Sequence, residues 1–239
     1  MRQFLPTTAF RGFGLLVLIG AIGAACPTPA QNTKTPYPNM APVDQYRMER
    51  SAEIDLARSA APESISRDAS IMVMGSRGYE TAIPGKNGFV CVVQRSWTTS
   101  SDDPEFWNPK LRAPICFNAP AVRTYLPITI KKTELVLAGH SKAQIVAAMN
   151  AALDKKELPA LEPGAMCYMM SKQGYLNDRA GHWHPHLMFF MPLTDAATWG
   201  ADLAGSPVLA TQDKENRLTI FLIPVSRWSD GTPDPRDAN

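Results

Sequence analysis

The sequence predicts one α+β domain, built on a mostly antiparallel sheet with helices on one face. Three observations predict this class. Strand-like segments come first, helix-like segments follow and strand-like segments return, which is an order typical of α+β proteins. Residues 44–239 are numerous enough to bury one sizeable core. Finally, 45% of the residues are apolar and 19% are charged, as in ordinary globular proteins.

The first residues predict an export signal. Arg2 and Arg11 precede the apolar run 13–25, which small residues follow. The run is shorter than the roughly 20 residues that a membrane span needs. We therefore expect a signal peptide over residues 1–25, with cleavage as late as residue 30. Since no later stretch of the sequence is as apolar, the mature chain is expected to lack a transmembrane helix and to reside in the bacterial periplasm or outer envelope.

Cys26 is a candidate lipidation site. Residues 23–26 read Gly-Ala-Ala-Cys and are similar to a bacterial lipobox, although lipoboxes usually carry Leu where this chain has Gly23. Residues 26–43 are rich in Pro and Thr, which is typical of a tether. A tether suits a lipid-anchored protein and a free one equally, so both remain open.

The charge balance argues against nucleic acid as a partner. The formal net charge of +2 comes from Arg2 and Arg11, because residues 31–239 carry equal numbers of acidic and basic side chains. Binding to phosphates needs clustered cations. We therefore expect no nucleic-acid partner, and the sequence names no other.

The N-terminal half predicts one helix and three strands. Apolar residues recur at helical spacing over 44–61, and Pro62 ends the pattern. Asn87-Gly88 lies between two apolar runs, and both of these residues tolerate positive φ, as hairpin turns require. The sequence therefore predicts a three-stranded antiparallel meander, with strands at 69–74, 79–83 and 89–97.

The C-terminal half predicts a loop, two helices and more strands. The prolines of residues 98–120 are typical of a long ordered loop. A helix capped by Asn118 and interrupted at Pro127 is expected to end at about Ala138. The later elements are expected to be a helix at 141–154, strands at 165–171 and 184–191, a helical turn at 194–201, a hairpin of 208–211 and 217–225, and a loose tail after residue 228.

Export makes the cysteines candidates for disulfide bonds. Cys91 and Cys116 bracket the proline-rich loop, so we expect them to form a bond. Cys167 lies in an apolar strand pattern and is expected to be a buried thiol. If Cys26 is retained, the four cysteines allow three pairings, and the sequence does not choose among them.

Three of the four histidines lie close together, in the segment Gly181-His182-Trp183-His184-Pro185-His186. Alternate residues of a strand face the same side, so these imidazoles are expected to point together. All three could meet on one ion only if Pro185 bends the chain. Imidazole suits transition metals, and the cluster therefore predicts a site for zinc or copper. The alternative is a hydrogen-bonded face in a structural or interaction protein of the cell envelope, with no cofactor.

Other side chains could complete such a metal site. Asp178 and Glu105 are candidates for an auxiliary oxygen ligand or a hydrogen-bond acceptor behind the histidines. Cys167 and the nearby methionines Met166, Met169 and Met170 would bring soft sulfur close if their strand pairs with the strand of the histidines, which would favour copper.

Ser141 offers a third interpretation. The segment 135–143 is similar to the strand–Gly-x-Ser-x-Gly–helix turn of α/β-hydrolases, with Asp178 and His184 as later partners. Ala143 stands where that motif has glycine, and the preceding segment also has helical character. A helix capping box of Ser141 and Gln144 explains the same residues better, so the hydrolase is a remote alternative and the chain gives no firm indication that it is an enzyme.

Aromatic and acidic residues gather in the long loop. Trp97, Phe106 and Trp107 lie near Glu105 and two further acids, Asp102 and Asp103. Such a set could line a ligand groove. It is also what a solvated turn with side-chain caps looks like, and the sequence favours that interpretation.

The chain resembles a group of exported bacterial proteins of unknown activity. The resemblance rests on the segments Asn87-Gly88-Phe89-Val90-Cys91, Pro104-Glu105-Phe106-Trp107-Asn108-Pro109 and Gly181-His182-Trp183-His184-Pro185-His186, with Ser59-Ala60-Ala61-Pro62. These segments span most of the expected mature domain. The resemblance implies export, and it brings no catalytic or binding residue with it.

Overall fold

The computed structural model describes residues 36–179 and 181–235. The expected signal peptide of residues 1–25, its alternative cleavage point at residue 30 and the candidate lipidation site Cys26 lie outside the described residues. No helix in the described ranges is long and apolar enough to cross a membrane.

One eight-stranded sheet runs through the domain, in the order β2-β1-β3-β4-β5-β6-β8-β7. β1 and β3 pair in parallel, and the other neighbouring strands pair antiparallel. The α+β class with a mostly antiparallel sheet is therefore confirmed. The strands are β1 (Ser70–Met74), β2 (Tyr79–Ile83), β3 (Val90–Gln94), β4 (Ala113–Phe117), β5 (Met166–Met169), β6 (His186–Pro192), β7 (Leu209–Asp213) and β8 (Leu218–Pro224).

The expected helices form with shifted boundaries. Residues 44–61 divide into a 3-10 helix and α1, which Glu49 caps by accepting a hydrogen bond from the Ala52 amide. The helix expected from Asn118 divides at Tyr125. The helices are α1 (Arg50–Arg58), α2 (Glu63–Ser66), α3 (Ala119–Thr124), α4 (Leu126–Leu137) and α5 (Lys142–Asp154), with 3-10 helices η1 (Val43–Tyr46), η2 (Ser96–Thr98) and η3 (Ala196–Trp199).

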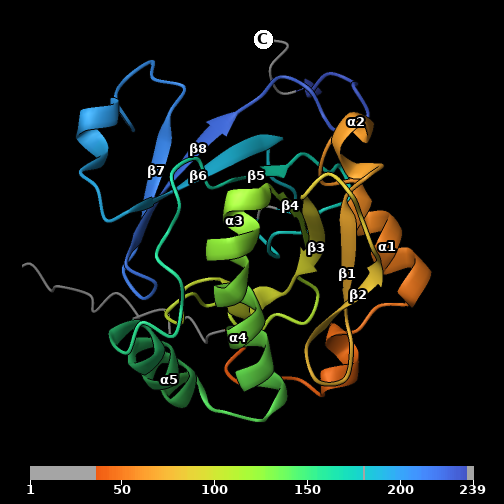
Figure 1. Cartoon of the computed structure of the whole chain (residues 1–239), viewed down its shortest axis with the longest axis vertical. Helices are drawn as coiled ribbons and strands as arrows, with labels where there is room; N and C mark the ends of the chain where they lie inside the picture. The colour runs from red at the N-terminus through yellow and green to blue at the C-terminus, as the bar shows by residue number, and fades with distance from the viewer. Residues whose placement is uncertain (1–35, 180, 236–239) are drawn as a thin grey trace, which may run out of the picture. The chain divides into compact units, whose positions relative to one another are not determined.

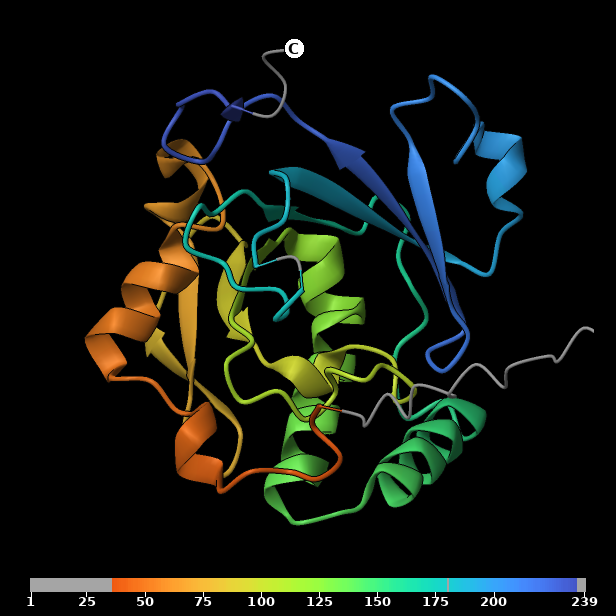
Figure 2. The ribbon, with the colours of Figure 1, turned by 180° about the vertical axis from the view of Figure 1, so that it is seen from behind.

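The helices lie on both faces of the sheet, whereas the sequence predicted a single face. α3 and α4 cover one face (Figure 1), where Val92, Ile115 and Phe117 belong to the larger core. α1 lies on the other face (Figure 2), and its Leu56 and Ala57 share a second core with the strands. The physical reason is that β3 and β4 are buried at nearly every position. Such strands need cover on both sides.

The expected three-stranded meander is wrong, because β1 lies between β2 and β3. The segment after β2 does not form a hairpin. The amides of Lys86 and Asn87 donate to the carbonyl oxygen of Asp68, and the Asn87 side chain donates to that of Ile65. These bonds hold the connection at the start of β1, so β3 begins beside β1 and runs parallel to it.

β4 lies inside the segment 98–120, for which the sequence predicts a loop. Pro114 is the reason that no strand is predicted there. Proline normally avoids central strands because it has no amide hydrogen to donate. β4 pairs with β3 over its whole length, but β5 pairs with only Cys116 and Phe117. Pro114 therefore stands in the half of β4 that has one ladder partner, where a missing donor is tolerated.

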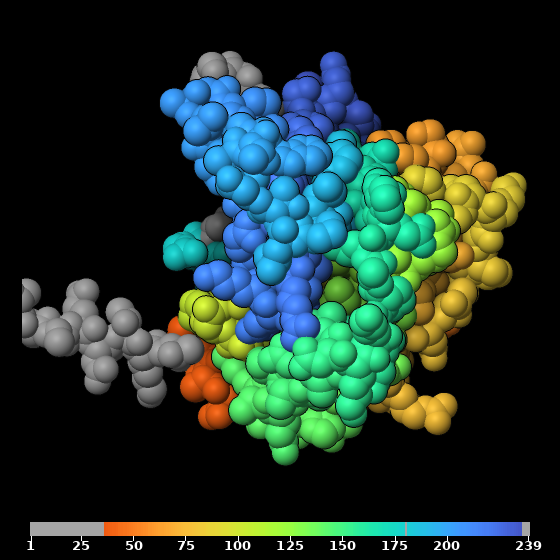
Figure 3. Space-filling model, turned by 60° about the vertical axis from the view of Figure 1, so that its left-hand side comes forward, coloured from red at the N-terminus to blue at the C-terminus, as the bar shows by residue number. Residues whose placement is uncertain are grey.

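Segments at both ends of the described chain pack more closely than the sequence predicted. Tyr37, Met40 and Ala41, from the expected tether 26–43, pack against the larger core. In the expected loose tail after residue 228, Asp234 is buried, and Trp228, which precedes that tail, is buried as well. By contrast, large apolar side chains are exposed between β6 and the start of β7, a segment drawn in blue on the face shown in Figure 3; they are Leu193, Trp199, Leu203 and, as the first residue of β7, Leu209.

Candidate functional site

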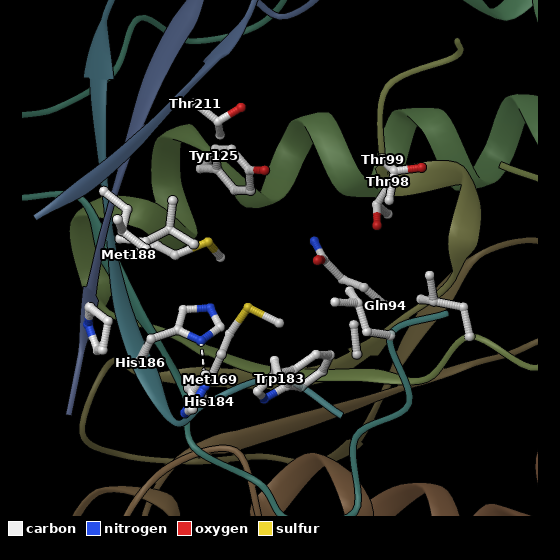
Figure 4. A pocket seen from close by; sticks show the side chains of 16 residues that line it. Gln94, Thr98, Thr99, Tyr125, Met169, Trp183, His184, His186, Met188 and Thr211 are labelled. Atoms are coloured by element: carbon white, nitrogen blue, oxygen red, sulfur yellow. Dashed lines mark hydrogen bonds between the residues drawn. The ribbon is translucent and has the colours of Figure 1, made fainter. Parts of the chain in front are cut away.

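A cavity of about 500 Å³ lies on the face of the sheet that α3 and α4 partly cover. Sixteen residues line it (Figure 4). They come from strands β3 to β8, from η2 and the loop that follows it, from the α3–α4 junction at Tyr125 and from the loop before β6. None of these sixteen is Asp, Glu, Lys or Arg. The cavity is therefore apolar, with a few neutral polar groups, which is the usual character of a site for a small molecule.

Strand pairing brings the floor of the cavity together. Met169 of β5 pairs with His186 of β6, which pairs in turn with Pro224 of β8. Two residues further along, Met188 pairs with Leu222. Because alternate residues of a strand share a face, both rows point to the same side of the sheet. Figure 4 shows the sulfur atoms of Met169 and Met188 pointing into the cavity.

His186 is a buried polar residue of the site, and a backbone hydrogen bond determines its tautomer. The residue is 8% exposed, and its Nδ1 lies 2.7 Å from the carbonyl oxygen of His184. A carbonyl oxygen can only accept, so Nδ1 carries the hydrogen and Nε2 carries the lone pair. Burial lowers the pKa of His186 below its ordinary value of 6.5, which keeps the ring neutral. Figure 4 shows Nε2, the ring nitrogen away from the dashed bond, pointing into the cavity that Met169 and Met188 also line.

Gln94 and Tyr125 are further polar residues of the cavity lining, beside three threonines and His184. The Gln94 side chain donates through Nε2 to the hydroxyl of Thr129 at 2.8 Å, and Figure 4 shows its amide across the cavity from His186. The Tyr125 ring stacks on Phe190, with centroids 3.8 Å apart. Its hydroxyl has no hydrogen-bond partner within the described part of the chain. Burial raises the pKa of Tyr125, so this hydroxyl stays protonated.

The three histidines do not converge. β6 begins at His186, so His182 and His184 lie in the preceding loop and are not on a strand. His182 Nδ1 lies 3.1 Å from the carbonyl oxygen of Gly174, and His184 Nδ1 lies 2.7 Å from the buried carboxylate of Asp234. Over the described ranges, no group of three His, Cys, Asp or Glu side chains could hold a metal ion. The zinc or copper site stays a prediction that rests on the sequence.

The candidate auxiliary ligands have other partners. Asp178 accepts hydrogen bonds from Tyr37, Tyr175 and Lys110, and these bonds hold the pKa of its carboxyl at about 2. Glu105 accepts from the Asn108 side chain. The strand pairing on which the sulfur ligands depended is present, because β5, which carries Met169, pairs with β6, which begins at His186.

The Ser141 segment forms a helix cap. The Gln144 amide donates to the Ser141 hydroxyl at 3.4 Å, and the Ser141 amide donates to the Gln144 side chain at 2.8 Å. Both bonds of the capping box are therefore present at the start of α5. The two other residues of the hydrolase interpretation are held elsewhere, His184 by Asp234 and Asp178 by tyrosines and a lysine.

The aromatic residues of the long loop belong to the core. Trp97, Phe106 and Trp107 are at most 5% exposed, and the Trp97 indole donates to the hydroxyl of Thr133. Asp103 accepts a hydrogen bond from the backbone amide of Glu105. This is the arrangement of a capped turn over a packed core.

The disulfide between Cys91 and Cys116 is present, and it joins directly paired residues of β3 and β4. Cys167 is a free, buried thiol. Burial raises the pKa of Cys167 well above its ordinary value, so the thiol stays protonated. Neither group reaches the cavity lining.

Sequence reasoning did not find Gln94, Tyr125 and Met188. One signal was available, because His186, Met188 and Phe190 alternate along an apolar strand and therefore share a face. No comparable signal links Gln94 or Tyr125 to that strand. Comparison with family models, with curated proteins and with solved structures finds no match for this chain.

Proposed function

We propose that the protein binds a small, uncharged and largely apolar molecule in the cavity beside His186. The observation that carries the proposal is the cavity itself, of about 500 Å³ and lined without Asp, Glu, Lys or Arg. Removing apolar ligand surface from water at such a site contributes roughly 25 cal/mol per Å². The few polar groups would then orient the ligand. A binding protein of this kind is consistent with the export that residues 1–30 predict.

The absence of charge in the lining decides the class of ligand. Placing a carboxylate or an ammonium group in an apolar cavity without a partner costs several kcal/mol or more. The neutral ring of His186 and the amide of Gln94 can accept or donate hydrogen bonds but cannot neutralise a charge. We therefore expect an uncharged ligand.

A fluorescent probe tests the proposal. N-phenyl-1-naphthylamine is uncharged, and its emission rises in apolar surroundings. With the purified protein, the emission should rise and saturate at about one probe per chain. Met188→Trp fills the cavity and should abolish the rise. Leu187→Trp is the matched control, because Leu187 lies one residue away and faces the opposite side of the sheet.

The outcomes are distinct. The proposal is supported if the wild type and Leu187→Trp bind the probe and Met188→Trp does not, with all three proteins unfolding cooperatively on heating. It is overturned if the wild type shows no saturable rise, or if both variants bind equally well. Metal analysis of the untagged protein tests the zinc or copper prediction separately, since a stoichiometric ion would support it.

A further inference from the structure

The polar groups of the cavity present a specific pattern, and it begins with His186. Nδ1 is committed to the carbonyl oxygen of His184, at 2.7 Å. Nε2 therefore offers a lone pair and no hydrogen. The residue is more than nine-tenths buried, and Nε2 is aimed into the cavity (Figure 4). A ligand that fills the cavity takes Nε2 out of contact with solvent, and an acceptor covered in this way is costly to leave unsatisfied. Such a ligand is therefore required to bring a donor to it.

The surroundings of Nε2 define the group that carries the donor. Met169, which pairs with His186, and Met188, two residues further along β6, line the cavity together with the imidazole, and Trp183 and Tyr125 line it as well (Figure 4). Sulfur and aromatic rings make favourable contacts with one another. A flat aromatic ring beside the donor therefore suits these methionine and aromatic side chains better than an aliphatic chain does.

We infer that the ligand is an uncharged aromatic hydroxyl compound, whose hydroxyl donates to Nε2 of His186 while its ring packs against the sulfur atoms of Met169 and Met188. This inference rests on the proposed function and adds the chemical class and the orientation of the ligand. The hydroxyl lies at the β5–β6–β8 floor, and the rest of the molecule extends toward Gln94.

A matched pair of probes tests the hydroxyl. 2-Naphthol carries the donor, and 2-methoxynaphthalene has the same ring system without it. Their affinities can be measured at about pH 7 by displacement of N-phenyl-1-naphthylamine, where a phenol with a pKa of about 10 is uncharged. The wild type should bind 2-naphthol at least tenfold more tightly than its methyl ether.

Two variants locate the acceptor. His186→Phe should reduce this ratio of affinities to about one, mainly by weakening 2-naphthol, and should still bind 2-methoxynaphthalene. Gln94→Leu, on the opposite wall, should keep the wild-type ratio. His186→Leu serves in place of His186→Phe if the larger ring prevents folding.

Each outcome has one meaning. Equal binding of both compounds to the wild type, or a preference that survives in the His186 variants and is lost in Gln94→Leu, overturns the inference and leaves the proposed function standing. If the wild type binds neither of these compounds nor the displaced probe, the proposed function itself fails.

Discussion

His186 shows how one backbone contact sets the chemistry of a side chain. The carbonyl oxygen of His184 fixes the tautomer, and burial disfavours the charged ring. The folded protein therefore keeps His186 neutral to lower pH than the unfolded chain does. As the pH falls below about 6.5, the unfolded chain takes up this proton first, so stability decreases.

A variant without the imidazole should lose this dependence. In urea unfolding at several pH values between about 7 and 4, His186→Gln should lose less stability on acidification than the wild type. Met188→Gln adds the same amide to the cavity but keeps the imidazole, so it should follow the wild-type slope. Equal slopes for the wild type and His186→Gln would contradict the role given to burial.

Ser141 permits a second test with a single residue. Its hydroxyl caps α5, and replacing a capping serine by alanine costs about 1 kcal/mol. Ser141→Ala should lower the free energy of urea unfolding by about that amount, and Ser141→Asp, which keeps an acceptor, should restore most of it. Labelling of the wild type but not Ser141→Ala by a fluorophosphonate would instead support the hydrolase interpretation.

At the scale of elements, a buried ion pair ties α1 to the sheet. Glu53 of α1 accepts from Arg95, which follows β3, at 2.9 Å, and from the Met74 amide at the end of β1. Both charged side chains are at most 2% exposed. Arg95 also donates to the carbonyl oxygens of Tyr46 and Val93. Removing one member leaves the other charge buried without its partner.

Glu53→Ala should therefore destabilise the protein by about 3–5 kcal/mol in urea unfolding. Glu80→Ala is the control. The pair of Glu80 with Arg50 also links α1 to the sheet, but both side chains are more than half exposed. Its loss should cost less than about 1 kcal/mol. Similar costs for the two variants would show that burial of the Glu53 pair carries no special weight.

The disulfide joins two strands that are already paired. In the chain-entropy picture, closing a loop with a separation of 25 residues contributes about 3–4 kcal/mol. The double variant Cys91→Ala/Cys116→Ala should lose stability of that order. Mass mapping without reduction should find Cys91 linked to Cys116 and Cys167 alkylated only after unfolding. Any other linkage would contradict the structure.

The sequence predicts those features that local pattern determines. Asn118 and Ser141 lie at helix starts because caps act over three residues, and the Cys91–Cys116 bond follows from a loop with obvious ends. Features that depend on contacts between residues far apart in the sequence could not be predicted from local pattern.

The errors have separate physical causes. Asn87-Gly88 has hairpin chemistry, but hydrogen bonds to Asp68 and Ile65 direct the chain elsewhere. The alternation of the histidines suggested one strand face, yet His184 is held by Asp234, fifty residues away in sequence. The cavity is beyond local pattern for the same reason, because it needs the register of β5, β6 and β8 together.

At the scale of the whole molecule, the sheet has two unequal halves. β1, β3 and β4 are covered by helices on both faces and carry the disulfide. β6, β8 and β7 border the cavity, and the exposed apolar side chains of the described residues lie at Leu193, Trp199, Leu203 and Leu209 in this half. Local stability follows the density of buried contacts, so the two halves should open at different free energies.

Amide hydrogen exchange can resolve this difference. The amides of β3 and β4 should exchange last, near the rate of global unfolding, and those of β7, at the edge of the sheet, should exchange first. Saturating 2-naphthol should slow exchange in β6, β8 and β7, because a ligand that binds the folded state stabilises the elements that form its site. It should change β1 and β2 little. Uniform protection across the sheet would contradict its division into two halves. Slowing by 2-naphthol that is confined to β1 and β2 would contradict the position of the site.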